Sequence, residues 1–472
     1  MLKKVNKIIF GISLLSAFIL LIMLLLLDMI PTKYLFVVVM FFILVYAVFG
    51  LFSIKLKNKI GLCVLLVFEL IFAILSVFAS DKIYETNDFI EALNRSKKEE
   101  IIYYVMVNKE SAYNHISDIE KKDVGTYFAN DKNEQAVLKK LSQEVTTAEK
   151  KYNNLSKMGE DLLNKNIDAI LMSGFQKELL TERLETFSKR TKVLYKIKLS
   201  IKKQKKETSN IDITKDPFSI YISGIDTAGA INTVSRSDVN IVLTVNPKTN
   251  EILLTSIPRD YYVSLHGIKE PKDKLTHAGL YGIDTSMSTI EDLLNIKLDY
   301  YVRVNFDTLV NVVDTIGGVD VYSDRDFKTY KGYIKKGVNH LNGEEALAFS
   351  RERKSFAEGD RKRGEHQEEV IRAIINKVSS STVMLTNYSS ILNSLSGSFE
   401  TSLPAEKIKQ FVKFQMNQMK PWAITTKNLD GTGSSAYTYS IPNENLYVMI
   451  PDEKTVVEAS SAIKALKEKR AE

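Results

Sequence analysis

The chain has 472 residues, a net charge of +7 from 64 basic and 57 acidic side chains, and one cysteine. This length allows two or more domains. The near balance of interspersed charges gives only weak support for a polyanionic partner, so we expect no nucleic acid to bind. The single cysteine, Cys63, excludes a disulfide framework and a thiolate metal site.

Residues 1–80 are predicted to form a membrane domain. Three apolar runs, at 8–27, 34–52 and 60–79, each approach the ~20 residues needed to cross a bilayer. Lysines precede the first run and separate the second from the third, which places both segments in the cytoplasm and the rest of the chain outside the cell. For Glu69, in the third run, we favour a protonated or interhelically hydrogen-bonded carboxyl group over a proton-transfer or partner site.

Residues 81–210 are rich in Lys and Glu and are predicted to form a small accessory α/β domain. The apolar patterns predict strands at 101–107, 124–128 and 167–172, and helices at 134–155 and 175–187. The charge runs at 196–198 and 202–206 are interpreted as a solvated linker, with attraction to anionic wall polymers or lipid as the alternative.

A β-hairpin is predicted next, with apolar strands at 239–245 and 252–257 on either side of a turn-rich segment. If Val245 pairs with Ile252, the antiparallel register places Asp238 opposite Arg259. Guanidinium and carboxylate groups then alternate at one end of the strands. Such an end could bring a phosphate and a divalent cation together.

A strand at 218–225 precedes Asp226, and Asp238 begins the first strand of the hairpin. If these strands are neighbours, both carboxylates emerge at the same edge of the sheet. A carboxylate pair with few histidines nearby suits a hard cation such as Mg²⁺, with Mn²⁺ as the alternative. The spacing alone fits a cation site and a structural role equally well; in the structural role, each acid caps a turn or pairs with Arg236.

A second basic cluster precedes a helical pattern that is expected to begin near Arg361 or Arg363, with Gln367 on the same face as Arg363. Arg351 and Arg353 would share a face if the backbone there is extended. Arginines at a helix N-terminus oppose the helix dipole unless an anion binds there, and guanidinium groups on several elements could clamp a pyrophosphate. Taken alone, the pattern favours a solvated basic helix start paired with neighbouring acids.

Seven motifs, in this order, resemble the LytR–CpsA–Psr family, and the resemblance extends over roughly half of the chain. They are SGID (223–226), RSD (236–238), SIPRD (256–260), KLTHAG (274–279), NFDTLVNVVDTIGGVDV (305–321), LNGEEALAFSRER (341–353) and DRKRGEHQ (360–367). The membrane segment followed by an accessory block is similar to the arrangement in capsule-associated members of that family.

The resemblance implies a mixed α/β catalytic domain at 211–450, with a central sheet and a hydrophobic pocket for a polyprenyl chain. The Lys/Glu-rich end of the chain predicts a C-terminal helical tail at 451–472. It implies a Mg²⁺-assisted phosphotransferase that moves a capsular or other wall glycopolymer from an undecaprenyl-pyrophosphate carrier to peptidoglycan. Membrane lipid and capsule-assembly membrane proteins are its other implied partners. The catalytic domain would lie on the outer face of a multi-pass membrane protein.

Carried over residue by residue, the resemblance assigns Mg²⁺ to Asp226 and Asp238, and gives Asp260, Asp360 and Arg361 supporting roles. One of these acids would serve as the general base. The pyrophosphate would be bound by Arg236, Arg259, Lys274, Arg351, Arg353, Arg363 and Gln367. Of the whole set, the residues expected to be catalytic are Arg236, Arg259, Asp260 and Arg353.

Two other functions stay open from the sequence. One is a non-catalytic, membrane-anchored regulator of capsule assembly that binds polyprenyl pyrophosphates. The other is a lipid pyrophosphatase. A regulator that binds DNA is disfavoured, because no helix pair typical of DNA binding stands out and the basic residues would lie outside the cell.

Overall fold

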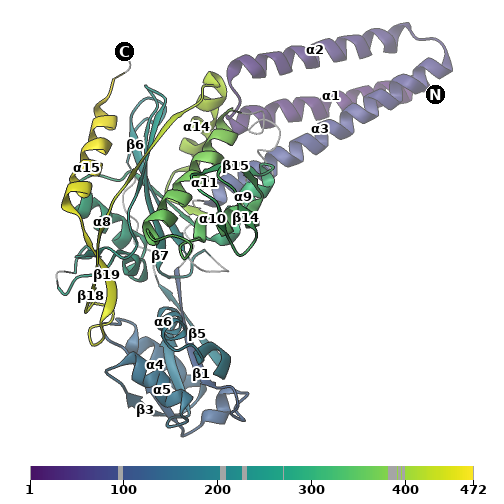
Figure 1. The fold of residues 1–472 in the computed structure, drawn as a ribbon. Helices are drawn as coiled ribbons and strands as arrows, with labels where there is room; N and C mark the ends of the chain where they lie inside the picture. The colour runs from purple at the N-terminus through teal and green to yellow at the C-terminus, as the bar shows by residue number, and fades with distance from the viewer. Residues whose placement is uncertain are drawn as a thin grey trace.

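The computed structural model describes residues 2–93, 99–201, 209–225, 231–268, 270–380, 391, 395 and 399–470. Figure 1 shows long N-terminal helices projecting from one end of a central α/β body, with a smaller α/β unit at the lower end. The predicted mixed α/β fold class is confirmed.

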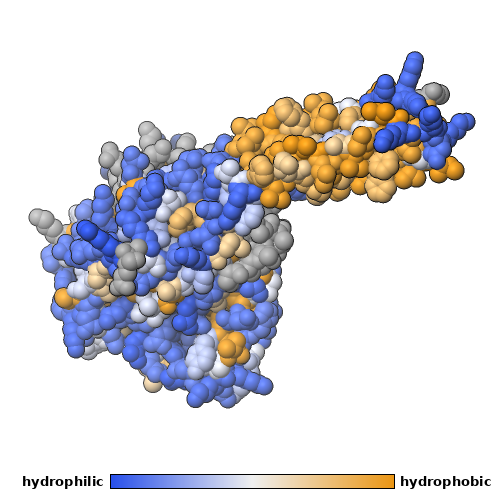
Figure 2. Space-filling model, turned by 90° about the horizontal axis from the view of Figure 1, so that it is seen from above, coloured by the Kyte–Doolittle hydropathy of each residue, from blue (hydrophilic) through white to orange (hydrophobic). Residues whose placement is uncertain are grey.

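Three N-terminal helices, α1 (Leu2–Leu27), α2 (Thr32–Lys55) and α3 (Lys59–Leu93), cover the predicted spans and are long and apolar enough to cross a membrane. Their sides form a broad apolar surface in Figure 2. Glu69 is buried between helices, where Asn6 Nδ2 donates to Glu69 Oε2 at 3.1 Å. The interhelical hydrogen bond that we favoured for Glu69 is therefore confirmed.

The accessory domain contains a five-stranded sheet in the order β3-β2-β4-β1-β5. Its strands are β1 (Glu99–Asn108), β2 (Asp123–Thr126), β3 (Ala148–Lys151), β4 (Ala169–Ser173) and β5 (Thr191–Ile201). Its helices are the 3-10 helix η1 (Ile116–Ile119), α4 (Glu134–Glu144), α5 (Leu155–Leu163), α6 (Gly174–Arg183) and α7 (Phe187–Arg190). Two apolar clusters, one containing α4 and the other α5 and α6, hold these helices against the sheet.

Two predictions for this domain are wrong. The helix predicted over 134–155 ends at Glu144, because Val145 takes an extended backbone and the β-branched residues that follow favour a strand. The charge run at 196–198 lies in β5 and not in a linker. There Ile197 and Leu199 are buried while alternate lysines face solvent, as the period of a strand requires. The run at 202–206 lies outside the described residues.

The domain predicted at 211–450 is built on a six-stranded sheet in the order β16-β11-β6-β7-β8-β17. Its strands are β6 (Phe218–Ile225), β7 (Ser237–Asn246), β8 (Glu251–Ser256), β11 (Tyr300–Val304), β16 (Phe399–Thr401) and β17 (Ala423–Asn428). Strands β7 and β8 form the predicted hairpin, and Val245 pairs with Ile252 as expected. Strands β11 and β17 add in parallel to β6 and β8, so their connections cross over the sheet.

Helices cover both faces of this sheet. Buried side chains of α8 (Ile283–Leu294) and α15 (Glu453–Glu468) pack on one face, together with Tyr221 and Val242. Helices α11 (Asp360–Ser380) and α14 (Ala405–Gln418) pack on the other, against a core that includes Phe218 and Val245. Beside α11 lie α9 (Phe306–Thr315), α10 (Gly343–Arg351) and the short strands β12 (Val319–Ser323), β13 (Phe327–Lys328), β14 (Tyr333–Ile334) and β15 (Gly337–Leu341).

The accessory domain docks on the segment between β18 (Gly431–Ala436) and β19 (Leu446–Pro451). Glu444 in this segment accepts a hydrogen bond from Leu155 N at 2.7 Å and forms an ion pair with Arg183 of α6. A carboxylate at the start of α5 is also favoured by the helix dipole. Ile441 is buried in the core of the accessory domain. The two domains therefore share both a polar and an apolar contact.

Candidate functional site

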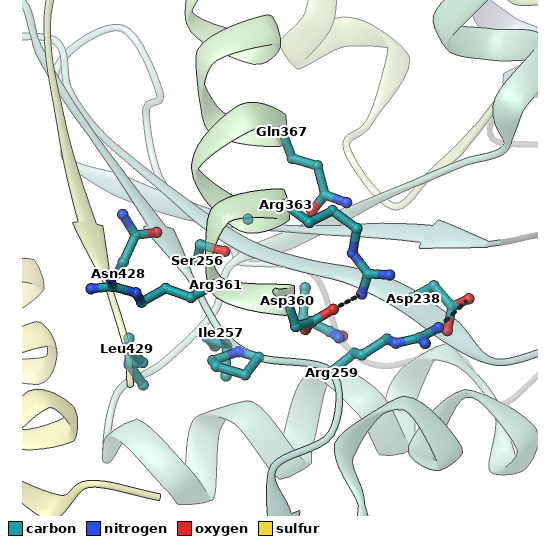
Figure 3. A pocket seen from close by; sticks show the side chains of 13 residues that line it. Asp238, Ser256, Ile257, Arg259, Asp360, Arg361, Arg363, Gln367, Asn428 and Leu429 are labelled. Carbon is teal, nitrogen blue, oxygen red and sulfur yellow. Dashed lines mark ion pairs between the residues drawn. The ribbon is translucent and has the colours of Figure 1, made fainter. Parts of the chain in front are cut away.

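The site forms where β7 begins and β8 ends, beside the first turn of α11 (Figure 3). Asp238 and Arg259 face each other across the two strands, and Arg259 Nη1 lies 3.0 Å from Asp238 Oδ2. Their pairing follows from the predicted register. Thr276, in the 3-10 helix η2 (Leu275–Tyr281), donates its hydroxyl to Asp238 Oδ1 at 2.9 Å. Three separate segments thus converge on one carboxylate.

The first turn of α11 places basic side chains over this end of the hairpin. The helix starts at Asp360, which confirms the predicted start near Arg361 or Arg363. Arg363 forms an ion pair with Asp360 and points toward the hairpin, whereas Arg361 points the other way, toward Asn428 (Figure 3). Gln367 lies one turn further on, on the side of Arg363. The first turn of α11 therefore sends Arg361 and Arg363 to opposite ends of the site.

Two glycines let these segments approach closely. A Cβ atom at Gly364 of α11 would lie 2.7 Å from Ser256 Oγ at the end of β8. A Cβ atom at Gly279 of η2 would lie 2.5 Å from Ser235 O and 2.9 Å from Ser237 N. Those two residues flank Arg236. The glycines of the KLTHAG and DRKRGEHQ motifs thus set the distances between the segments that form the site.

A pocket opens between these elements. It is lined by Asp238, Asn240, Ser256, Ile257, Pro258, Arg259, Asp360, Arg361, Arg363, Gly364, Gln367, Asn428 and Leu429. Most of these side chains are polar or charged. The pocket therefore suits a charged ligand.

A second ion pair lies beside the pocket. Lys274 Nζ is 2.8 Å from Asp260 Oδ1, and Arg259 Nε is 3.7 Å from Asp260 Oδ2. Burial opposes ionisation of Asp260, but the positive charges of Lys274 and Arg259 outweigh it and lower the pKa of that carboxyl group. Asp260 therefore holds both cations in place.

A buried cluster of Asp273, His277 and Ser440 holds the loop that carries Lys274 and Thr276. His277 Nδ1 lies 2.6 Å from Asp273 Oδ1, and Ser440 Oγ donates to Asp273 Oδ2 at 2.5 Å. A nucleophilic triad requires the serine to bond to the imidazole, but this serine bonds to the carboxylate. We conclude that the cluster is structural.

The charges at the centre of the site depend on one another. Burial opposes ionisation of Asp238, but the guanidinium groups of Arg259, Arg236 and Arg363 hold its pKa at about 2. Burial, together with the nearby positive charges of Arg259 and Arg353, lowers the pKa of Arg363. Guanidinium groups packed this closely repel one another, and a polyanion placed between them would relieve that repulsion.

Arg236 reaches two carboxylates that the sequence analysis did not single out. Its Nη2 atom lies 3.2 Å from Glu178 Oε2 and 3.1 Å from Glu182 Oε1, both on helix α6 of the accessory domain. The acidic pattern of α6 contains no signal that identifies this contact, because its partner belongs to another domain. Thr276 was likewise missed, although it lies within a recognised motif.

The structure does not bring every predicted site residue to the pocket. The pocket is lined by Asp238, Arg259, Asp360, Arg361, Arg363 and Gln367. Asp260 and Lys274 lie beside it as an ion pair, and Arg236 pairs with glutamates of α6. Arg351 and Arg353 do not share one extended segment, because α10 continues through Arg351. Arg351 is exposed and its guanidinium lies 4.2 Å from the centre of the Phe306 ring, while Arg353 is exposed near Arg363. Asp226 lies outside the described residues, so its pairing with Asp238 stays a prediction.

The described part of the chain contains no group of three or more His, Cys, Asp or Glu side chains that could hold a metal ion. Asp238 nevertheless presents an ionised carboxylate at the pocket. Mg²⁺ commonly takes one or two carboxylates and completes its shell with phosphate oxygens and water. The residues therefore fit an ion that binds together with a phosphate ligand, and they do not form a preformed cage.

Glu368, on α11, gives a testable pH dependence. It is 1% exposed, and burial raises its pKa from 4.5 to about 9. The unfolded chain releases this proton near pH 4.5 while the folded chain keeps it, so stability falls as the pH rises between these values. We expect Glu368→Gln to stabilise the full-length protein in detergent by about 1–3 kcal/mol at pH 8.5 and by much less at pH 5. Chemical denaturation at both pH values measures this, and an equal effect at both would contradict it.

Comparison with protein families gives a match to the model described as the LytR_cpsA_psr family over residues 184–464, more than half of the chain. The chain is 37% identical over 235 residues to the polyisoprenyl-teichoic acid–peptidoglycan teichoic acid transferase TagU of Bacillus cereus, covering 49% of this chain and 76% of that protein. It is 34% identical over 273 residues to TagU of Bacillus subtilis, covering 57% and 85%.

Solved structures are also similar. The crystal structure of B. subtilis TagV is 32% identical in sequence and covers 54% of this chain and 99% of its own, with a TM-score of 0.45. The structure of TagT bound to LIIa-WTA is 28% identical and covers 55% of this chain and 94% of its own, with a TM-score of 0.44.

Proposed function

The chain belongs to the LytR–CpsA–Psr family, and from this premise we propose that it transfers a capsular or other wall glycopolymer from an undecaprenyl-pyrophosphate carrier to peptidoglycan. One observation carries the proposal: Arg259, just after the end of β8, and Arg363, at the N-terminus of α11, reach into one pocket around Asp238. Guanidinium groups on separate elements match the oxygens of a pyrophosphate. The relatives named as teichoic acid transferases support a polymer of the cell wall as the group transferred.

The proposed reaction is a displacement at phosphorus. A hydroxyl group of peptidoglycan attacks the phosphorus that bears the sugar, so a new P–O bond forms and a phosphodiester results. The bond from that phosphorus to the bridging oxygen breaks, and polyprenyl phosphate leaves with the electron pair. Arg259 and Arg363 stabilise the charge that develops on the phosphate oxygens.

The proton of the attacking hydroxyl passes to a carboxylate of the site. Asp238 is a weak base, since its pKa is held at about 2. Lys274 and Arg259 lower the pKa of Asp260 as well, so we propose that Asp360, the other carboxylate at the site, accepts the proton. Mg²⁺, held by Asp226 and Asp238, would add positive charge on the phosphate oxygens when it is bound.

Apolar side chains next to the site suit the polyprenyl chain. Ile222, Val239 and Leu243 on the sheet, and Ile371 and Ile375 on α11, are only half-buried although they pack on one core. In Figure 1, α14 lies beside the N-terminal helices. Lys413 of α14 forms an ion pair with Asp28, beside the end of α1, at 2.6 Å. We propose that the chain of the carrier lies along this face, on the outer side of the membrane.

A transfer assay tests this function. Full-length protein in detergent is incubated with Mg²⁺, a polyprenyl-pyrophosphate-linked glycopolymer and peptidoglycan. We expect a covalent glycopolymer–peptidoglycan product and equimolar polyprenyl phosphate. Phosphate release without conjugate would show a pyrophosphatase, and binding without turnover would show a regulator; either result would contradict the proposal.

A further inference from the structure

Helix α6 of the accessory domain extends into the site of the catalytic domain. Glu178 and Glu182 lie one helical turn apart on the same face of α6, and both contact Arg236 Nη2. The side chain of Arg236 is only 10% exposed, whereas those of Glu178 and Glu182 are 36% and 55% exposed. The arginine is therefore buried at the domain interface, and the two carboxylates that contact it are partly exposed.

Contacts on both sides of the glutamates hold α6 in this position. At its start, Ser173 and Gln176 form a capping box, and the Phe175 ring lies edge-on to the His277 ring at 4.8 Å. At its end, Arg183 forms an ion pair with Glu444. The approach of α6 to Arg236 is therefore part of the domain interface and does not depend on the two glutamates alone.

The two glutamates make the surroundings of Arg236 more negative. Arg236 alone carries one positive charge, and the cluster of Arg236, Glu178 and Glu182 carries one net negative charge.

We propose that Glu178 and Glu182 are specificity-determining residues, which compete with simple anions for Arg236 and so reserve the site for a lipid-linked pyrophosphate. This inference rests on the proposed function. A small anion has only its charge with which to displace the glutamates, whereas the full donor also gains contacts through its polyprenyl chain and sugar. Specificity of this kind comes from an interaction that opposes the wrong ligand. Ion pairs with partly exposed glutamates are weak, so the full donor can displace them.

The test uses Glu178→Gln/Glu182→Gln in full-length protein, with inorganic pyrophosphate as the probe in titration calorimetry. We expect the double variant to bind pyrophosphate about three- to tenfold more tightly than the wild type. Glu160→Gln/Glu185→Gln is the matched control, because it removes two exposed carboxylates from the same domain. Adding Arg236→Gln to the double variant is expected to abolish the gain.

Unchanged, weaker or undetectable pyrophosphate binding by the double variant would overturn the inference, as would an equal gain in the control. Thermal unfolding of each variant shows whether the domain interface is intact. The two proposals fail separately. A gain in pyrophosphate affinity without transfer activity would refute the proposed transferase and support the competition for Arg236. Transfer activity without a gain in pyrophosphate affinity would support the transferase and refute the competition.

Discussion

Arg259→Ala is expected to lower kcat/KM for glycopolymer transfer by about 10²- to 10³-fold, the effect of removing a preorganised group that stabilises transition-state charge. Arg259 lies at the centre of the network, since it contacts both Asp238 and Asp260 and lines the pocket. Its loss removes a positive charge from the phosphate and leaves two carboxylates that repel it. The expected loss is therefore larger than for a residue at the edge of the pocket.

The measurement is the rate of conjugate formation at several donor concentrations. Arg372→Ala is the control: it removes an arginine from α11 that forms an ion pair with Glu369 of the same helix. Arg259→Lys keeps the charge without the guanidinium fork and should retain part of the activity. Wild-type transfer by a folded Arg259→Ala protein would remove the arginine clamp from the mechanism.

Arg303→Met is expected to destabilise the full-length protein by about 3 to 5 kcal/mol, because it leaves a buried carboxylate without its cation. Arg303 lies on β11 and is 2% exposed. Its Nη1 atom is 3.7 Å from Glu99 Oε1 on β1 of the accessory domain, and its Nη2 donates to Thr233 O at 2.9 Å. Glu99 is also buried, so water cannot replace the guanidinium.

Chemical denaturation in detergent measures this loss, and the double variant Arg303→Met/Glu99→Met is its control. Replacing both members of a buried ion pair by apolar residues is often neutral or stabilising. We therefore expect the second substitution to restore much of the stability lost in the first. A single variant as stable as the wild type, or a double variant less stable than the single variant, would show that Arg303 does not stabilise the buried carboxylate of Glu99.

Local patterns were sufficient for much of the fold. Strands β7 and β8 are two apolar runs on either side of a short turn. Their register could therefore be predicted, and Asp238 could be placed opposite Arg259. The apolar spacing after Arg363 likewise located the start of α11. Each of these features depends on residues that are close in the chain. The helix predicted to continue past Glu144 was wrong, because the pairing of β3 with the more distant β2 overrides the local helical spacing.

The amino-acid pattern alone specified three apolar helices, a small α/β domain after them, a hairpin that ends in opposite charges and an arginine-rich helix start. It could not show that Arg351 lies on Phe306, away from the pocket, or that α6 reaches Arg236 from another domain. Hydrophobic periodicity reports which face of an element is buried, and this is a property of neighbouring residues. The partner of a charged side chain depends on how distant elements pack, and that packing emerges only when the whole chain has folded.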